Sequence, residues 1–176
     1  MLTAFRASPA GKLLRLGLIV FVARTAGAES QTAGRSQPRP VGAIEREMLA
    51  VHNAVRAEVK LPPLQWSSAL ASFSQKWADT LVAKNRTAHN PNSPYGENIF
   101  VSGIGSTPSM VVIQWSSESR DYSYRTNSCA GDCGHYTQIV WRHTRKVGCA
   151  VARGARREVW VCSYDPPGNY RNEWPY

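Results

Sequence analysis

The feature that most restricts the fold is the placement of the cysteines, because all four lie in the last third of the chain. They are Cys129, Cys133, Cys149 and Cys162. An even number of cysteines behind a secretory leader is typical of disulfides rather than of free thiols. The sequence therefore predicts two disulfides in a domain that folds in an oxidising compartment.

The first 28 residues have the pattern of such a leader. Basic residues precede an apolar run from Leu16 to Ala23, and the small residues Ala26-Gly27-Ala28 follow it. The run has about eight apolar residues, whereas a membrane-spanning helix needs roughly twenty. We therefore predict a signal peptide at residues 1–28, export to the extracellular space, and no integral membrane anchor.

The rest of the chain suits one domain. Residues 29–42 are rich in Gln, Ser, Gly and Pro and predict a flexible lead-in, so the folded domain is expected at residues 43–176, as a monomer. Removal of the leader, with four basic and no acidic residues, lowers the formal charge from +9 to +5. Because no aromatic and basic stripe accompanies this moderate charge, we expect no nucleic-acid partner.

The apolar spacing predicts helices first and a hairpin last. Helices are expected from about residue 44 to 60, from Ser67 or Ser68 to about Ala83, and from Thr107 onwards. A strand is expected at residues 98–101, and a β-hairpin at residues 147–152 and 159–164. The side chains expected on the buried faces are Ile44, Met48, Val51 and Val55, then Leu70, Phe73, Trp77 and Leu81, then Met110, Ile113 and Trp115. This order predicts an α+β class.

Few residues are candidates for chemistry. The sequence has no glycine-rich phosphate loop, no HExxH zinc motif and no GxSxG nucleophile elbow. The remaining candidates are His52, His89, Glu97, Glu118, His135 and His143. Taken alone, a histidine beside a helix start, such as His135, is more often a hydrogen-bonded structural residue than a catalyst.

Five ordered segments resemble the CAP superfamily, the group that contains cysteine-rich secretory proteins, antigen five and the plant pathogenesis-related proteins of group one. GHYTQIVWRHT (134–144) and VCSYDPPGN (161–169) resemble its two signatures, while HNAVR (52–56), GEN (96–98) and WSSE (115–118) match further segments. The C-terminal GNYRNEWPY is similar to the ending of the plant group. The resemblance implies a three-layer α-β-α sandwich, and export to the plant apoplast.

The resemblance also implies a cleft lined by a tetrad of His89, Glu97, Glu118 and His135. Two imidazoles that face two carboxylates can hold a divalent cation such as zinc or magnesium, with His89 and His135 as metal ligands. They can instead exchange protons, or simply tie the helices to the sheet. We expect no enzyme, because no serine or cysteine is identifiable as a nucleophile held by a histidine.

The resemblance also implies the disulfide pairing Cys129–Cys133 and Cys149–Cys162. The usual plant pattern has a third bridge, whose two positions are occupied here by Asn85 and Gly154. The resemblance therefore implies that the segment around His89 is looser. Asn85-Arg86-Thr87 is also an N-glycosylation sequon, which a secreted protein can use if the asparagine is exposed, although such a triplet also arises by chance.

The resemblance implies an antimicrobial and antifungal defence protein that binds sterol or another lipid, or a microbial surface. Phe73 and Trp77 could form the wall of a lipid groove, although aromatic residues at helical spacing are more often simply packed. One alternative is a precursor that releases its last eleven residues, Pro166 to Tyr176, as a signalling peptide. A second alternative is a metal-assisted hydrolase built on the tetrad.

Overall fold

A computed structural model of the protein describes residues 41–176, so the predicted signal peptide and the lead-in up to residue 40 lie outside the described residues. The helices are α1 (Val41–Glu58), α2 (Ser68–Ala83), α3 (Pro108–Ser116) and α4 (Gly134–Ile139), with a 3-10 turn η1 (Ser117–Asp121). The strands are β1 (Gln65–Trp66), β2 (Gly96–Ser102), β3 (Tyr122–Ser123), β4 (Ser128–Cys129), β5 (Lys146–Arg153) and β6 (Glu158–Asp165). The α+β class is confirmed, and none of the described helices is long and apolar enough to cross a membrane.

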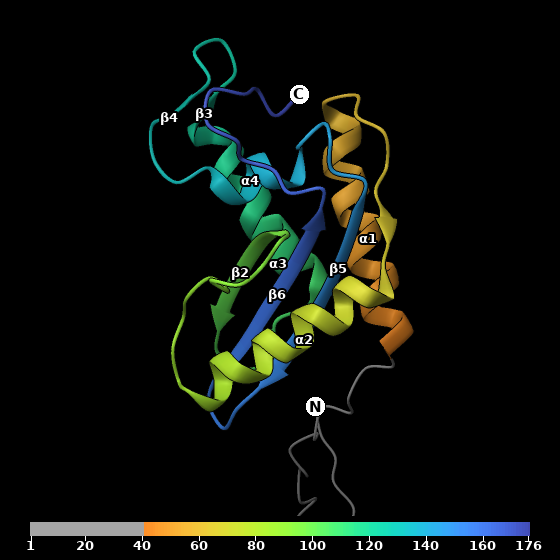
Figure 1. Cartoon of the computed structure of the whole chain (residues 1–176), viewed down its shortest axis with the longest axis vertical. Coiled ribbons are helices and arrows are strands. Elements are labelled where there is room, and N and C mark those ends of the chain that lie inside the picture. Colours follow the sequence, from red (N-terminus) through yellow and green to blue (C-terminus); the bar gives the residue numbers. More distant parts are fainter. Residues whose placement is uncertain (1–40) are drawn as a thin grey trace, which may run out of the picture. The chain divides into compact units, whose positions relative to one another are not determined.

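The main sheet has the strand order β1-β5-β6-β2, in which β5, β6 and β2 are antiparallel and β1 lies parallel to β5. Helix α2 covers one face of β5 and β6, while α1, α3 and α4 lie on the other face (Figure 1). Along β6, Val159 and Val161 pack under α2, whereas Trp160, Cys162 and Tyr164 pack toward α1 and α3. The three-layer α-β-α sandwich is therefore confirmed.

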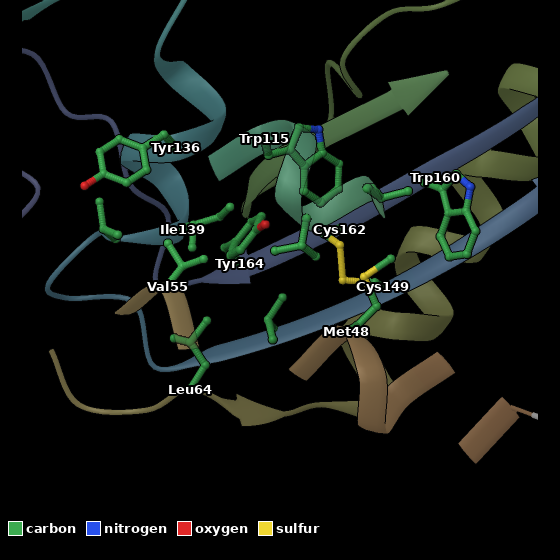
Figure 2. Close-up of a cluster of buried hydrophobic side chains, with 14 residues drawn as sticks. Met48, Val55, Leu64, Trp115, Tyr136, Ile139, Cys149, Trp160, Cys162 and Tyr164 are labelled. Atoms are coloured by element: carbon green, nitrogen blue, oxygen red, sulfur yellow. A yellow bond between two sulfur atoms is a disulfide. The ribbon is translucent and has the colours of Figure 1, made fainter. Parts of the chain in front are cut away.

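The larger core lies between the sheet and the helices α1, α3 and α4 (Figure 2). Trp115 of α3 and Met48 of α1 pack there against the β5–β6 hairpin, whose residues Cys149 and Cys162 are opposite each other and disulfide-bonded. The disulfide thus joins the two central strands inside the core, between residues that are paired in the hairpin.

Polar side chains of α1 hold neighbouring segments to this helix. Asn53 exchanges two hydrogen bonds with the backbone of Leu64, at 2.7 and 3.1 Å. The fully buried Arg56 donates to the carbonyl oxygens of Pro62, Ile139, Trp141 and Thr144. Burial, together with the positive charge of Arg145, lowers the pKa of Arg56 to about 10. Asn53 thus fixes the segment before β1 to the first helix, and Arg56 fixes the C-terminal end of α4 to it.

Helix α2 differs from the prediction in the face that it buries. Ser67 caps it by accepting a hydrogen bond from the Leu70 amide, as expected. The fully buried stripe contains the small residues Ser74 and Ala78 between Leu70 and Leu81. Phe73 and Trp77, which were predicted on that stripe, lie at its edge and are half-buried.

The reason is the short distance between α2 and the sheet. A Cβ atom at Gly148 of β5 would overlap the Ala71 amide nitrogen and the Ser67 carbonyl oxygen. At such a close approach only small side chains fit between helix and strand, so the large aromatic rings are displaced to the side.

Helix α3 begins as predicted, with Thr107 as its cap and Pro108 in its first turn. Trp115 is buried, but Met110 and Ile113 are 56% and 57% exposed, so the prediction that they are core residues was wrong. The buried positions are instead Val111 and Val112, because α1 and α4 pack on that side of the helix.

Candidate functional site

The four tetrad residues come from four separate elements. His89 lies in the loop after α2, and Glu97 is the second residue of β2. Glu118 belongs to η1, and His135 is the second residue of α4. Each histidine contacts one of the two carboxylates, so the tetrad consists of two imidazole–carboxylate pairs.

The first pair joins the His89 loop to β2. The Nδ1 atom of His89 lies 2.7 Å from Oε1 of Glu97, and the Asn90 amide donates to the same oxygen at 3.1 Å. The Glu97 side chain is 5% exposed, whereas that of His89 is 70% exposed. The buried Glu97 carboxylate therefore orients an imidazole that is largely exposed to solvent.

The second pair joins η1 to α4. The Nδ1 atom of His135 lies 2.6 Å from Oε1 of Glu118. The other carboxylate oxygen accepts from the amides of His135 and Tyr136, at 2.9 and 3.3 Å. The His135 ring also stacks on Trp115, with the ring centroids 6.0 Å apart. Hydrogen bonds and stacking together hold His135 in one orientation.

An open cavity of about 420 Å³ separates the two pairs. Its lining includes His89, Glu97 and His135, whereas Glu118 is not among the lining residues. Further residues that line it are Gly96, Asn98, Asp132, Gly134, Gln138, Gly168 and Asn169. Glu118 thus orients His135 from behind, and the cavity presents two imidazoles, Glu97 and Asp132 to a ligand.

Gly96 is needed at this position because a Cβ atom there would overlap the amide of Gln138. Gln138 in turn accepts a hydrogen bond from the Gly168 amide at 3.0 Å. Sequence reasoning did not identify Asp132, Gln138 or Asn169 as cleft residues. The family signatures that contain Gln138 and Asn169 were the available signal, and Asp132 had none.

A buried hydrogen-bond network supports the cleft from below. His52 contacts the Met48 carbonyl oxygen through Nδ1, at 2.8 Å, and the Tyr164 hydroxyl through Nε2, at 2.9 Å. Asn98 donates to the Tyr164 hydroxyl and to the His135 carbonyl oxygen. Burial lowers the pKa of His52 to about 4 and raises that of Tyr164 well above its ordinary value. Both groups therefore stay neutral at pH 7.

The donor set at the cleft fits a divalent cation in part. Both histidines use Nδ1 to contact a carboxylate, which leaves each Nε2 as the nitrogen available to a metal; this is the common arrangement of metal-binding histidines. In addition, Oε2 of Glu97 is buried and has no hydrogen-bond partner within residues 41–176.

The ligands are not, however, gathered around one point. Within the described part of the chain, three donor atoms lie within 4.8 Å of one another only at His52, Cys149 and Cys162. The two sulfurs there form a disulfide and cannot act as thiolates, so that cluster is no metal site. Three tetrad ligands could hold one cation only if they moved closer together, and His89 is the most exposed of the four side chains.

The other predicted residues lie outside the cleft. Phe73 packs edge to face on Tyr95, with centroids 5.1 Å apart, and Trp77 donates to the Ala88 carbonyl oxygen. His143 is exposed on the surface beyond α4. Phe73 and Trp77 thus support the loop that carries His89.

Both disulfides have the pairing that the resemblance implied, Cys129–Cys133 and Cys149–Cys162. At Asn85, one of the two positions that the resemblance assigned to a third bridge, the structure has a clasp made by Arg157. Its guanidinium donates to Asn85 Oδ1 at 2.9 Å and to the Arg86 carbonyl oxygen at 3.0 Å. The segment before His89 is therefore held to the β5–β6 hairpin without a covalent bond.

The C-terminal tail, residues 166–176, forms part of the cleft wall. Asn169 accepts from Thr137 and donates to the Gly134 carbonyl oxygen, at 2.7 and 2.9 Å. Further along, Trp174 donates to the Tyr124 carbonyl oxygen, and the Tyr176 ring stacks on Tyr124. The tail is thus bound to the domain along its length.

Known proteins are similar to this chain in sequence. The family model described as "Cysteine-rich secretory protein family" matches residues 49–164. "Pathogenesis-related protein 1" of Arabidopsis thaliana is 39% identical over 133 residues, which cover 75% of this chain and 82% of that protein.

Solved structures have the same fold. Venom allergen-like protein 4 of Schistosoma mansoni has a TM-score of 0.62 at 24% identity, over 76% of this chain and 93% of that one. The structure titled "Crystal structure of NaASP2 with Zn2+" has a TM-score of 0.63 at 23% identity, over 76% and 84% of the two chains.

Proposed function

The chain belongs to the cysteine-rich secretory protein (CAP) family, and on that premise we propose that it is a secreted, pathogenesis-related defence protein that acts by binding rather than by catalysis. The observation that carries the proposal is its 39% identity to a plant pathogenesis-related protein 1 over 75% of the chain. Two disulfides and a predicted leader support an extracellular location.

We propose that the ligand is a sterol or a related lipid, and that it occupies a second cavity of about 540 Å³ at the edge of the sheet. This volume lies in the range of small-molecule sites. The cavity is bounded by α1, α2 and β5, and its apolar lining includes Ile44, Trp66, Ala71 and Val151. Phe73 and Trp77, the groove wall suggested by the sequence, do not line it.

Binding of radiolabelled sterol to the oxidised domain tests this proposal. Ser72 is exposed at the rim of the cavity, so Ser72→Trp should block entry without disturbing the core and should reduce binding at least tenfold. Phe73→Ala is the matched control on the neighbouring face of α2 and should leave binding unchanged. Loss of binding in Phe73→Ala alone would place the lipid along the aromatic edge of α2, and no saturable binding to the wild type would remove the lipid role.

For the tetrad we propose that His89 and His135 hold zinc or magnesium through Nε2, while Glu97 and Glu118 orient their rings. A structure of similar fold is titled as solved with Zn²⁺. A bound cation would supply a Lewis acid at the cleft. Zinc titration by calorimetry checks the assignment, because His135→Ala should weaken binding at least tenfold, whereas His143→Ala should not change it.

The hydrolase alternative has less support. Among the hydrogen bonds of the described residues, neither tetrad imidazole contacts a hydroxyl or thiol that could act as a nucleophile. Assays on ester and peptide libraries with added zinc test it, since turnover that Glu97→Gln abolishes would establish an enzyme.

The peptide-precursor alternative also has less support than the lipid-binding role. A protease that cuts after Asp165 needs an extended segment, but Thr144 donates to the Pro166 carbonyl oxygen and the following residues are bound to α4. Release would therefore require local unfolding of the tail. Mass spectrometry of extracellular fluid under stress is the direct test, because detection of the free Pro166 to Tyr176 fragment would favour the precursor role.

A further inference from the structure

The end of α2 exposes Asn85, whose side-chain nitrogen Nδ2 makes no hydrogen bond within residues 41–176. Asn85 follows the C-cap residue Lys84 and has a φ of 45°, the left-handed conformation that asparagine tolerates better than most residues. The backbone amide of Asn85 donates to the Val82 carbonyl oxygen, and the backbone amide of Arg86 donates to the Leu81 carbonyl oxygen. These two bonds are those of a Schellman motif, so the Asn85 backbone is fixed by the helix end.

The Asn85 side chain is oriented as well. Its Oδ1 accepts from Arg157, which anchors one side of the planar amide group. Oδ1 and Nδ2 are bonded to the same carbon and point in different directions within that plane, so the Oδ1 bond to Arg157 leaves Nδ2 available. All three residues of the Asn85-Arg86-Thr87 triplet are exposed, and this is the single Asn-x-Ser/Thr triplet of the sequence.

We propose that Asn85 carries an N-linked glycan, an inference that rests on the secretion included in the proposed function. Nδ2 attacks the anomeric carbon of a polyprenyl-pyrophosphate-linked oligosaccharide. The new C–N bond forms as the bond from that carbon to the pyrophosphate breaks; the amide gives up one proton and the lipid pyrophosphate leaves. The linkage uses Nδ2 alone, so the folded domain keeps the Oδ1 bond to Arg157.

The position explains why the modification is compatible with this fold. Asn85 is exposed, and its contacts are made entirely by its backbone and Oδ1. The glycan would cover the turn between α2 and the loop of His89 without displacing a buried group.

The test is expression of residues 1–176 in a eukaryotic secretory host, once with the native leader and once with residues 1–28 replaced by a leader of that host. Secreted protein is compared by gel mobility and peptide mass before and after an amidase that removes N-linked glycans and converts the asparagine to aspartate. We expect a mobility shift that the amidase removes, with conversion at Asn85.

Thr87→Ala removes the sequon but keeps Asn85 and its helix-ending conformation, so it should abolish the shift. Thr87→Ser keeps the sequon and should retain the shift. An unmodified Asn85 in protein exported by the host leader overturns the glycan proposal. Retention of the native-leader protein inside the cell, with glycosylated export through the host leader, overturns the secretion proposal and supports the glycan.

Discussion

Acidification should destabilise this domain through His52. The imidazole is fully buried, and the Met48 carbonyl oxygen can only accept, so Nδ1 carries the proton and Nε2 accepts from the Tyr164 hydroxyl. A second proton would remove that acceptor and leave a charge in the core. Burial accordingly lowers the pKa of His52 to about 4 in the folded protein, against 6.5 as the ordinary value.

The sign follows from proton uptake. Between pH 6.5 and about 4 the unfolded chain binds a proton at this residue and the folded chain does not, so stability falls as the pH falls through this window. Over about 2.5 pH units the loss amounts to about 3 kcal/mol. Above pH 6.5 the contribution of His52 is complete and constant.

Urea unfolding of the oxidised protein at several pH values between 4 and 7.5 measures this effect. His52→Gln keeps a polar side chain but cannot titrate, so its free energy of unfolding should fall by about 3 kcal/mol less than that of the wild type over the window. His143→Gln replaces an exposed histidine and should keep the wild-type decrease. Parallel curves for wild type and His52→Gln would refute the reasoning.

Three further predictions concern stability and order. Burial alone would raise the pKa of Glu158, but hydrogen bonds from Trp160 and from the loop before α3 outweigh burial and lower the pKa. Glu158→Gln should therefore reduce the free energy of unfolding at pH 7 by about 3 kcal/mol, as measured by urea titration. Gly148→Ala should lower the free energy of unfolding by about 3 kcal/mol or more, because the new Cβ overlaps α2. Gly103→Ala, at a position with open space around it, should leave the free energy of unfolding nearly unchanged, and thermal unfolding compares the two variants. Arg157→Ala should accelerate hydrogen exchange of the amides at the C-terminal end of α2, and the exposed neighbour Arg156→Ala should not.

The sequence predicted the elements well because their signals are local. Ser67 and Thr107 cap α2 and α3 as expected, and the two apolar runs around the last cysteines form the hairpin. The faces of the helices were harder to predict. Met110 and Phe73 were assigned to the core by hydrophobicity, but burial depends on which side the neighbouring layer packs and on how closely it approaches.

The site could be predicted only through the resemblance. His89 and Glu97 are eight residues apart in the sequence, and Glu118 and His135 are seventeen apart, so no helical or strand periodicity places them together. The Arg157 clasp could not be foreseen at all. Its guanidinium and its acceptors are more than seventy residues apart, and a scattered surface arginine has no sequence signature.

The C-terminal tail would serve both as the released peptide and as part of the cavity wall, so one molecule could not supply both. The same eleven residues that would leave as a peptide include Gly168 and Asn169, which line the tetrad cavity. Each copy that is cut after Asp165 would lose that wall, so the number of peptides released and the number of intact cavities would sum to the number of molecules made. Each cut would be irreversible, so only fresh synthesis would replace the cavities that were lost.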